Sequence, residues 1–398
     1  MARAKGVRRT SEDRYAIGLD IGVTAIRAAL LKSGRSKGLR PTIIRLAELP
    51  LPTDTIVAGS VEQPAALSNS IKSLWRRGHL RPRTARFNLP EDIVLTRRTS
   101  APWMVEGDFG AALRYQVADA LPIDINTVQL DYYPLGDREE VQSSGRANRV
   151  KDILLVAAPT DEITDRANAM LKARVEPLGA DTTAFALIRS AYVGLQQDDG
   201  QIHAIVDIGG AQLTTAIHRM GVPLFVRAIS NSAGSAAVDA VARATDSVDD
   251  RTFAERLAVR AGLSGSAPIV TGIAESSVFA NHVQATGMAS TVEDSIDDEL
   301  RRAAARALDP WANTLIREIR ETLDFYNATA TDPIATVTLA GRTASMQGLI
   351  ERLATSVPYR VLRFDPLADL PAHRRVRNNP PTDSRFATAI GLALGTST

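Results

Sequence analysis

Residues 15–32 read YAIGLDIGVTAIRAALLK, and residues 203–219 read HAIVDIGGAQLTTAIHR. In both stretches alternating apolar residues lead into the triplet Asp-Ile-Gly, and a second apolar run starts after a short turn. Each stretch therefore predicts a strand, a tight turn and a second strand. Because this unit occurs twice, the sequence predicts two domains of similar construction that face each other.

Length and composition exclude several classes of protein. The chain has 398 residues, of which 44% are hydrophobic, so it is long enough for more than one folded unit. It has no cysteine, which excludes disulfides, thiolate metal sites and thiol nucleophiles. The formal net charge of +2 is too small for a surface built as a whole to bind nucleic acid. No apolar run reaches the length of a spanning helix, and we expect a soluble, cytoplasmic chain.

The remaining pattern predicts how the chain divides into domains. The polar and basic residues 1–13 are expected to be disordered. A new strand pattern begins near Arg83, and strands alternate with helices from there to about residue 175, which indicates a small α+β insert. The predicted division is a first domain of residues 14–82 and 176–200, an insert of residues 83–175, and a second domain of residues 201–395.

The two turns have the composition of a phosphate site. Tight glycine turns bind phosphate oxygens because their backbone N–H groups converge and no side chain blocks the approach. Asp20 and Asp207 end the strands that lead into the turns, and carboxylates so placed can hold Mg²⁺ directly or through water. Thr24 and Thr214 add hydroxyl groups, and Arg27 adds a cation.

A third glycine element strengthens this interpretation. Leu339-Ala340-Gly341 ends a predicted strand before a helix, and a glycine there lets a base or ribose approach the backbone. One Asp-Ile-Gly alone is more often an ordinary strand end. Two copies followed by the third element, with a long helical stretch between the second and the third, form a much more specific pattern.

These motifs resemble a known family. GLDIG at 18–22, VDIGG at 206–210 and TLAG at 338–341 are similar to the first phosphate, second phosphate and adenosine motifs of the actin-like ATPase superfamily. Within it the chain most resembles the PilM family, the FtsA-like cytoplasmic components of type IV pilus assembly. The stretch ALRYQVADALPIDINTVQLDYYPL at 112–135 resembles the small inserted domain shared with FtsA, and the resemblance covers about residues 15–395.

The resemblance implies a fold and a nucleotide site. The fold is α/β and actin-like, with duplicated ribonuclease H-like domains and a small FtsA-like α+β insert. The implied cofactors are ATP or ADP and Mg²⁺, with at most slow ATPase activity and no assigned catalytic residue. Asp20 and Asp207 are the implied metal ligands. The implied nucleotide-binding residues are Asp20, Gly22, Val23, Thr24, Arg27, Asp207, Gly209, Gly210, Gln212, Thr214, Gly341 and Arg342.

The resemblance also implies a partner. In this family a groove between the first domain and the insert binds the short cytoplasmic N-terminal segment of PilN, a membrane protein. We expect that groove on the surface shared by residues 83–100 and the following helix. The chain would then lie on the cytoplasmic side of an inner-membrane platform, attached through its partner, with no nucleic acid bound and self-association left open.

Three departures from the family pattern concern the nucleotide site. The first turn continues as Val23-Thr24-Ala25 with Arg27, where the family tends to carry a small hydroxyl run followed by lysine. Thr183 stands where relatives often have a glutamate. Arg342 and Thr343 replace two glycines, and the guanidinium can either stack on the base or fill its space.

Other functions remain open at this point. A sugar or acetate kinase of the same superfold would need a carboxylate base, and the acids between residues 84 and 200 show no pattern for one. An FtsA-like filament or membrane tether would need a C-terminal amphipathic helix, which the last residues do not show. A scaffold with a lost nucleotide site is the third alternative. Arginines stand at positions 76, 77, 81 and 83, close to Trp75 in the sequence. We expect them to form the solvated end of a helix, with the tryptophan packed beneath it, rather than a site for an anionic ligand.

Overall fold

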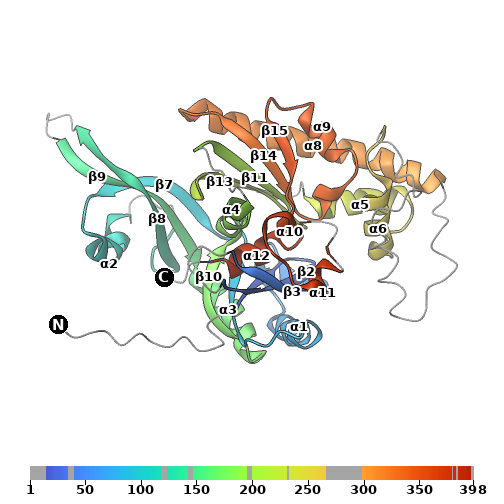
Figure 1. The fold of residues 1–398 in the computed structure, drawn as a ribbon, viewed down its shortest axis with the longest axis horizontal. Coiled ribbons are helices and arrows are strands. Elements are labelled where there is room, and N and C mark those ends of the chain that lie inside the picture. The colour runs from blue at the N-terminus through green and yellow to red at the C-terminus, as the bar shows by residue number, and fades with distance from the viewer. Residues whose placement is uncertain are drawn as a thin grey trace.

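The computed structural model shows two five-stranded sheets, helices that cover them, and a smaller insert (Figure 1). Residues 1–13, expected to be disordered, lie outside the described part. The described residues are 15–34, 40–117, 123–141, 147–194, 200–230, 233–265, 298–378, 380–381 and 384–395. Among them no helix is both long enough and apolar enough to cross a bilayer.

The first sheet has the strand order β10-β6-β1-β2-β3. Strands β1, β2 and β3 form an antiparallel meander. On the other side of β1, β6 pairs parallel with β1, and β10 pairs parallel with β6. The strands are β1 (Tyr15–Ile21), β2 (Ala25–Lys32), β3 (Thr42–Pro50), β6 (Thr84–Leu89) and β10 (Glu176–Thr182).

The second sheet repeats this arrangement. Its order is β13-β12-β11-β14-β15, again an antiparallel meander of three strands with two parallel strands added beside the first. The strands are β11 (Ile202–Ile208), β12 (Gln212–Arg219), β13 (Val222–Ser230), β14 (Ile334–Ala340) and β15 (Arg360–Arg363). The repeated order confirms the predicted duplicated α/β fold.

Helices cover both faces of each sheet. On the outer face of the first sheet, α1 (Pro64–Arg77) and α3 (Thr160–Lys172) contact each other and bury Leu67, Ile71 and Met170. A short hairpin, β4 (Ile56–Val57) and β5 (Ser60–Val61), precedes α1. The second sheet packs against α5 (Gly234–Ala244), α6 (Arg251–Ala261) and α8 (Asp298–Thr329).

Two helices lie between the sheets. α4 (Thr183–Gly194) contacts β11 and β12 of the second sheet, and it also contacts α12 (Ala387–Ala393), which packs on β1, β2 and β6 (Figure 1). The contact with α12 is close because a Cβ on Gly391 would lie 1.7 Å from the carbonyl oxygen of Ala186. α12 therefore packs on the first sheet, whereas the sequence division placed residues 201–395 together in the second domain.

The insert is a three-stranded sheet covered by one helix. Its order is β7-β9-β8, with β7 (Leu95–Pro102), β8 (Val128–Val141) and β9 (Ala147–Pro159), and α2 (Glu106–Gln116) packs Phe109 and Leu113 onto it. β6, which the sequence division assigned to the insert, pairs with β1 and β10. The insert sheet therefore begins at Leu95 rather than near residue 83.

The segments after β14 are short. A 3₁₀ turn at Thr343–Ser345 leads to α9 (Leu349–Ala354). Further on, the chain makes two single-turn helices, α10 (Pro366–Asp369) and α11 (Arg374–Arg377).

Candidate functional site

The two Asp-Ile-Gly turns have the same backbone geometry. In the first, the N–H of Gly22 donates to the carbonyl oxygen of Ala25 at 3.1 Å. In the second, the N–H of Gly209 donates to the carbonyl oxygen of Gln212 at 3.0 Å. A Cβ on Gly209 would lie 2.9 Å from that acceptor, so a larger residue would open the turn.

The residues opposite the two aspartates differ. Asp20 faces Arg27 across the β1–β2 pair, and Arg27 Nη1 lies 3.4 Å from Asp20 Oδ2. Asp207 faces Thr214 at the corresponding place in the β11–β12 pair, and its carboxylate has no ion pair and no hydrogen bond among the described residues. The duplication therefore leaves one carboxylate neutralised and its counterpart free.

The turns approach each other from the two sheets. A Cβ on Gly210 would lie 3.5 Å from Oγ1 of Thr24, so the second turn lies against the first. Burial raises the pKa of Asp207 to about 7, and the negative charge of Asp20 adds to this shift. Arg27 opposes it. The two carboxylates therefore repel each other through space.

The third element lies on the second turn. Gly341 follows β14 with a φ of +95°, and a Cβ there would lie 2.5 Å from the carbonyl oxygen of Ile208 and 3.0 Å from Asp207 Oδ1. Both the backbone conformation and the close approach therefore require glycine. The structure brings together the three motifs that the sequence singled out.

The N-terminus of α5 also lies on the second turn. The N–H of Gly234 donates to the carbonyl oxygen of Gly209, and the N–H of Ser235 donates to that of Gly210, both at 2.8 Å. A Cβ on Gly234 would clash with Oγ1 of Thr343. Neither Gly234 nor Ser235 was among the predicted site residues, although a Gly-Ser pair at the start of a helix is a sequence signal for such a contact.

Arg342, which follows Gly341, forms an ion pair with Glu255 of α6. The pair joins the loop after β14 to α6, and both side chains are about one-third exposed. The guanidinium therefore has a protein partner beside the place where the resemblance implies the base. Arg342 was among the predicted site residues, whereas Glu255 was not.

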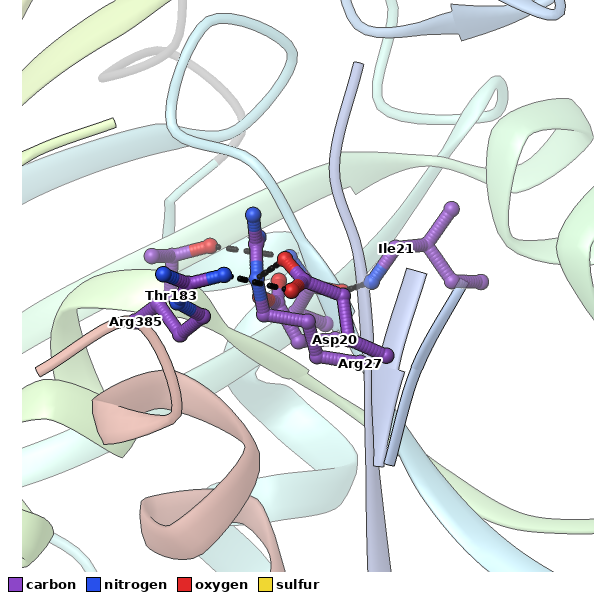
Figure 2. A network of polar contacts seen from close by, with 7 residues as sticks. Asp20, Ile21, Arg27, Thr183 and Arg385 are labelled. Atoms are coloured by element: carbon purple, nitrogen blue, oxygen red, sulfur yellow. Dashed lines mark hydrogen bonds and ion pairs between the residues drawn. The ribbon is translucent and has the colours of Figure 1, made fainter. Parts of the chain in front are cut away.

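A second ion network surrounds the first turn (Figure 2). Arg27 Nε donates to Glu48 of β3 at 2.9 Å, and Arg385 Nη1 donates to the other oxygen of that carboxylate at 2.6 Å. Burial tends to raise the pKa of Glu48, but Arg27 and Arg385 outweigh it and lower the pKa below its usual value. Burial raises the pKa of Asp20, and Arg27 opposes that shift.

A neutral network supports the turn from the other side. Asn88 of β6 accepts the N–H of Ile21 at 2.6 Å and donates to Oγ1 of Thr183 at 3.2 Å (Figure 2). Thr183, which stands where relatives often have a glutamate, therefore anchors α4 to the strand behind the first turn. Its hydroxyl also donates to the carbonyl oxygen of Leu89.

Three other predicted residues lie in or beside the turns. Val23 is half-buried and packs on the core of the first sheet, and Thr214 is 2% exposed. Gln212 accepts a hydrogen bond from Thr214, but its buried Nε2 has no partner among the described residues. The second turn therefore has a free carboxylate and an unpaired amide N–H beside it, groups of the kinds that bind Mg²⁺ and a phosphate oxygen.

A pocket of about 830 Å³ lies between the insert and the first domain. Its walls are the segment after β6, the ends of β8 and β9, and the first turns of α3. The lining residues are Asp92, Ile93, Val94, Leu95, Ile123, Thr127, Val128, Ala157, Pro159, Thr160, Asp161, Thr164 and Asp165. Residues 92–95 fall within the predicted 83–100 surface, whereas α3 takes the place expected for α2.

A family model described as type IV pilus assembly protein PilM matches residues 18–252 and 297–397. This chain belongs to the PilM family. Membership confirms the resemblance read from the motifs to this family of type IV pilus assembly proteins.

Solved structures support the fold. A PilM–PilN type IV pilus biogenesis complex matches at 22% identity and a TM-score of 0.72, over 95% of this chain and 97% of that one. The ethanolamine utilization protein EutJ from Carboxydothermus hydrogenoformans matches at 13% identity and a TM-score of 0.51, over 98% of this chain and 91% of that one. The PilM-family fold thus extends over nearly the whole chain.

Proposed function

We propose that this PilM-family chain binds ATP with Mg²⁺ between its two sheets and serves pilus assembly by changing shape. The observation that carries the proposal is the meeting of the two glycine turns, with the unneutralised carboxylate of Asp207 beside the second turn. In this proposal, phosphate oxygens accept hydrogen bonds from the backbone N–H groups of both turns other than those of Gly22 and Gly209, which close the turns themselves. Gly341 leaves room for the nucleoside beside the second turn.

The residues present fit a magnesium ion. Asp207 and Asp20 are oxygen ligands of the kind Mg²⁺ prefers, and a pair of carboxylates that repel each other gains from a cation. Mg²⁺, when bound, would neutralise phosphate charge and join the two turns through the triphosphate. Because Arg27 already holds Asp20, Asp207 is the stronger candidate for direct contact.

A ligand that contacts both turns couples the domains. The bound ligand favours the relative arrangement of the domains in which both turns reach the phosphates. It shifts the equilibrium between two arrangements only by as much as its affinities for them differ. α4 and α12 lie between the sheets, so a change in the angle between the sheets must pass through their contacts. Nucleotide therefore acts on shape, and turnover need not be fast.

We further propose that the pocket beside α3 binds the cytoplasmic N-terminal segment of a PilN-like membrane protein. The PilM–PilN complex among the similar structures supports this partner. The lining residues offer apolar walls and three carboxylates, Asp92, Asp161 and Asp165, and none of them is basic. A peptide with apolar residues and at least one cation complements that composition, and it would attach the chain to the membrane through its partner.

Calorimetric titration of the full chain with ATP tests the nucleotide site. We expect binding with a Kd well below a millimolar in Mg²⁺, weakened at least about tenfold by EDTA because Asp207 and Asp20 then face the phosphates without a cation. No heat at millimolar nucleotide in either condition would refute the proposal and leave the scaffold alternative.

Arg342→Gly tests the role of the guanidinium in that site. We expect ATP to bind about three- to tenfold more tightly, because the side chain and its ion pair occupy space beside the implied base position. Glu255→Gln is the matched control, since it breaks the ion pair but keeps the arginine. Weaker binding in Arg342→Gly would show that the guanidinium stacks on the base instead.

A further inference from the structure

One edge of the first domain carries a cluster of cations, which we call the cationic edge. α1 and α3 lie side by side at the bottom of Figure 1. Both end there, because β6 and β10, which follow them, run in parallel and start at neighbouring positions, Thr84 and Glu176. The cationic edge consists of the exposed residues Lys72, Arg76, Arg77, Arg81, Arg83, Lys172 and Arg174.

These cations have no counter-ions in the described part of the chain. None of the seven takes part in an ion pair there. α1 contains no acidic residue, and the acids of α3 all lie in its first half, at Asp161, Glu162 and Asp165. Glu176, the exposed first residue of β10, is the acid nearest in sequence to this edge. The charge is therefore unbalanced locally in a chain that is nearly neutral overall.

Helix ends explain only part of the cluster. Cations in the last turn of a helix are favoured by the helix dipole, which accounts for Arg76, Arg77 and Lys172. Arg81 and Arg83 lie in the segment between α1 and β6, where no dipole calls for them. The chain also enters the first sheet at this edge, since β1 runs parallel to β6, and the fourteen residues before Tyr15 include five basic and two acidic ones.

We propose that the cationic edge binds the anionic phospholipid surface of a membrane. The choice of a membrane rests on the proposed function, which puts the chain beside one through a peptide bound at the other end of α3. A single-stranded nucleic acid would need exposed aromatic rings to stack its bases, and Trp75, the aromatic residue of α1, is buried with Nε1 donating to Pro82. Several unpaired cations on one edge give an additive attraction to an anionic surface.

Vesicle sedimentation of the full chain tests the proposal without any partner protein. The probes are vesicles of phosphatidylcholine alone and vesicles that also contain phosphatidylglycerol. We expect binding to the anionic vesicles only, weakened by added salt. The patch variant Arg76→Gln/Arg77→Gln/Arg81→Gln/Lys172→Gln should bind at least about tenfold more weakly, since each cation near the surface contributes about fivefold.

A matched control removes the same charge elsewhere. Arg256, Arg260, Arg306 and Arg320 are exposed, form no ion pair with any residue that the structure describes, and lie on α6 and α8 of the second domain. Their quadruple glutamine variant should bind anionic vesicles as the unchanged chain does. Equal loss in both variants, or full binding by the patch variant, would overturn the proposal, as would binding of duplex DNA through the same residues without vesicle binding.

The test of lipid binding can fail or succeed independently of the proposed nucleotide and peptide binding. The patch variant keeps both nucleotide turns and every residue lining the pocket, so its titrations with ATP and with a PilN-like peptide should match those of the unchanged chain. Loss of vesicle binding together with retained peptide binding assigns the cationic edge to lipid.

Discussion

Asp207→Asn is expected to lower the affinity for Mg-ATP at least about tenfold and, in the same protein, to raise stability without nucleotide. The first effect follows because the amide keeps the shape of the side chain but removes the carboxylate that a magnesium ion needs. Asp207 makes no hydrogen bond or ion pair that the substitution would break among the described residues. Calorimetric titration with and without Mg²⁺ measures it.

The second effect follows from the raised pKa of Asp207, about 7 against an ordinary 3.8. Protonation favours the folded state, so this stabilisation is complete below about pH 4 and is lost as the pH rises through about 7. The amide cannot ionise, and the variant should exceed the unchanged chain by about 1 kcal/mol or more above pH 7, with no difference near pH 4. Thermal unfolding at both pH values measures this.

Asp249→Ala is the control for both measurements. Asp249 is exposed, belongs to the second domain and makes no ion pair within the described part of the chain, so its loss should change neither affinity nor the pH profile. Unaltered Mg-ATP affinity in Asp207→Asn would remove this residue from the metal site.

Thr164→Arg is expected to abolish binding of a PilN-like peptide. Thr164 is an exposed residue of α3 that lines the pocket, so a long cationic side chain there would fill the groove and repel a cationic peptide. We expect at least about a hundredfold loss, comparable to that at a central interface residue. Fluorescence anisotropy with a labelled peptide from the N-terminal segment of the neighbouring PilN-like protein measures it.

Asn168→Arg provides the matched control, one turn further along α3. Asn168 is exposed but does not line the pocket, so the same charge and bulk are added to the same helix outside the groove. Peptide binding should be unchanged in this variant. If both variants bind normally, the peptide binds elsewhere on the chain.

The sequence predicts the parts of the site that depend on local pattern. Alternating apolar residues and the Asp-Ile-Gly triplets reveal β1, β2, β11 and β12, and therefore the positions of Asp20 and Asp207. Gly341 is predictable for the same reason, since a strand-to-helix glycine is a local signal. The duplicated fold follows from these motifs, and the repeated strand order confirms it.

Contacts between distant residues could not be predicted in this way. Glu255 pairs with Arg342 across 87 residues, and Glu48 pairs with Arg385 across 337. Neither glutamate lies in a motif, so only the fold reveals that it neutralises a cation at the site. Strand β6 shows the same limit, because its own residues read as a strand but do not specify which sheet it joins.

The position of α12 has a consequence for how the protein is made. Its residues Ile390 and Ala393 complete a core with Ala29, Leu31 and Ile43, which leave the ribosome first. Every strand of the second sheet is translated before α12 emerges. During synthesis the first domain therefore keeps this apolar face exposed until the second domain has been translated. A chaperone that shields the face would act on the nascent chain.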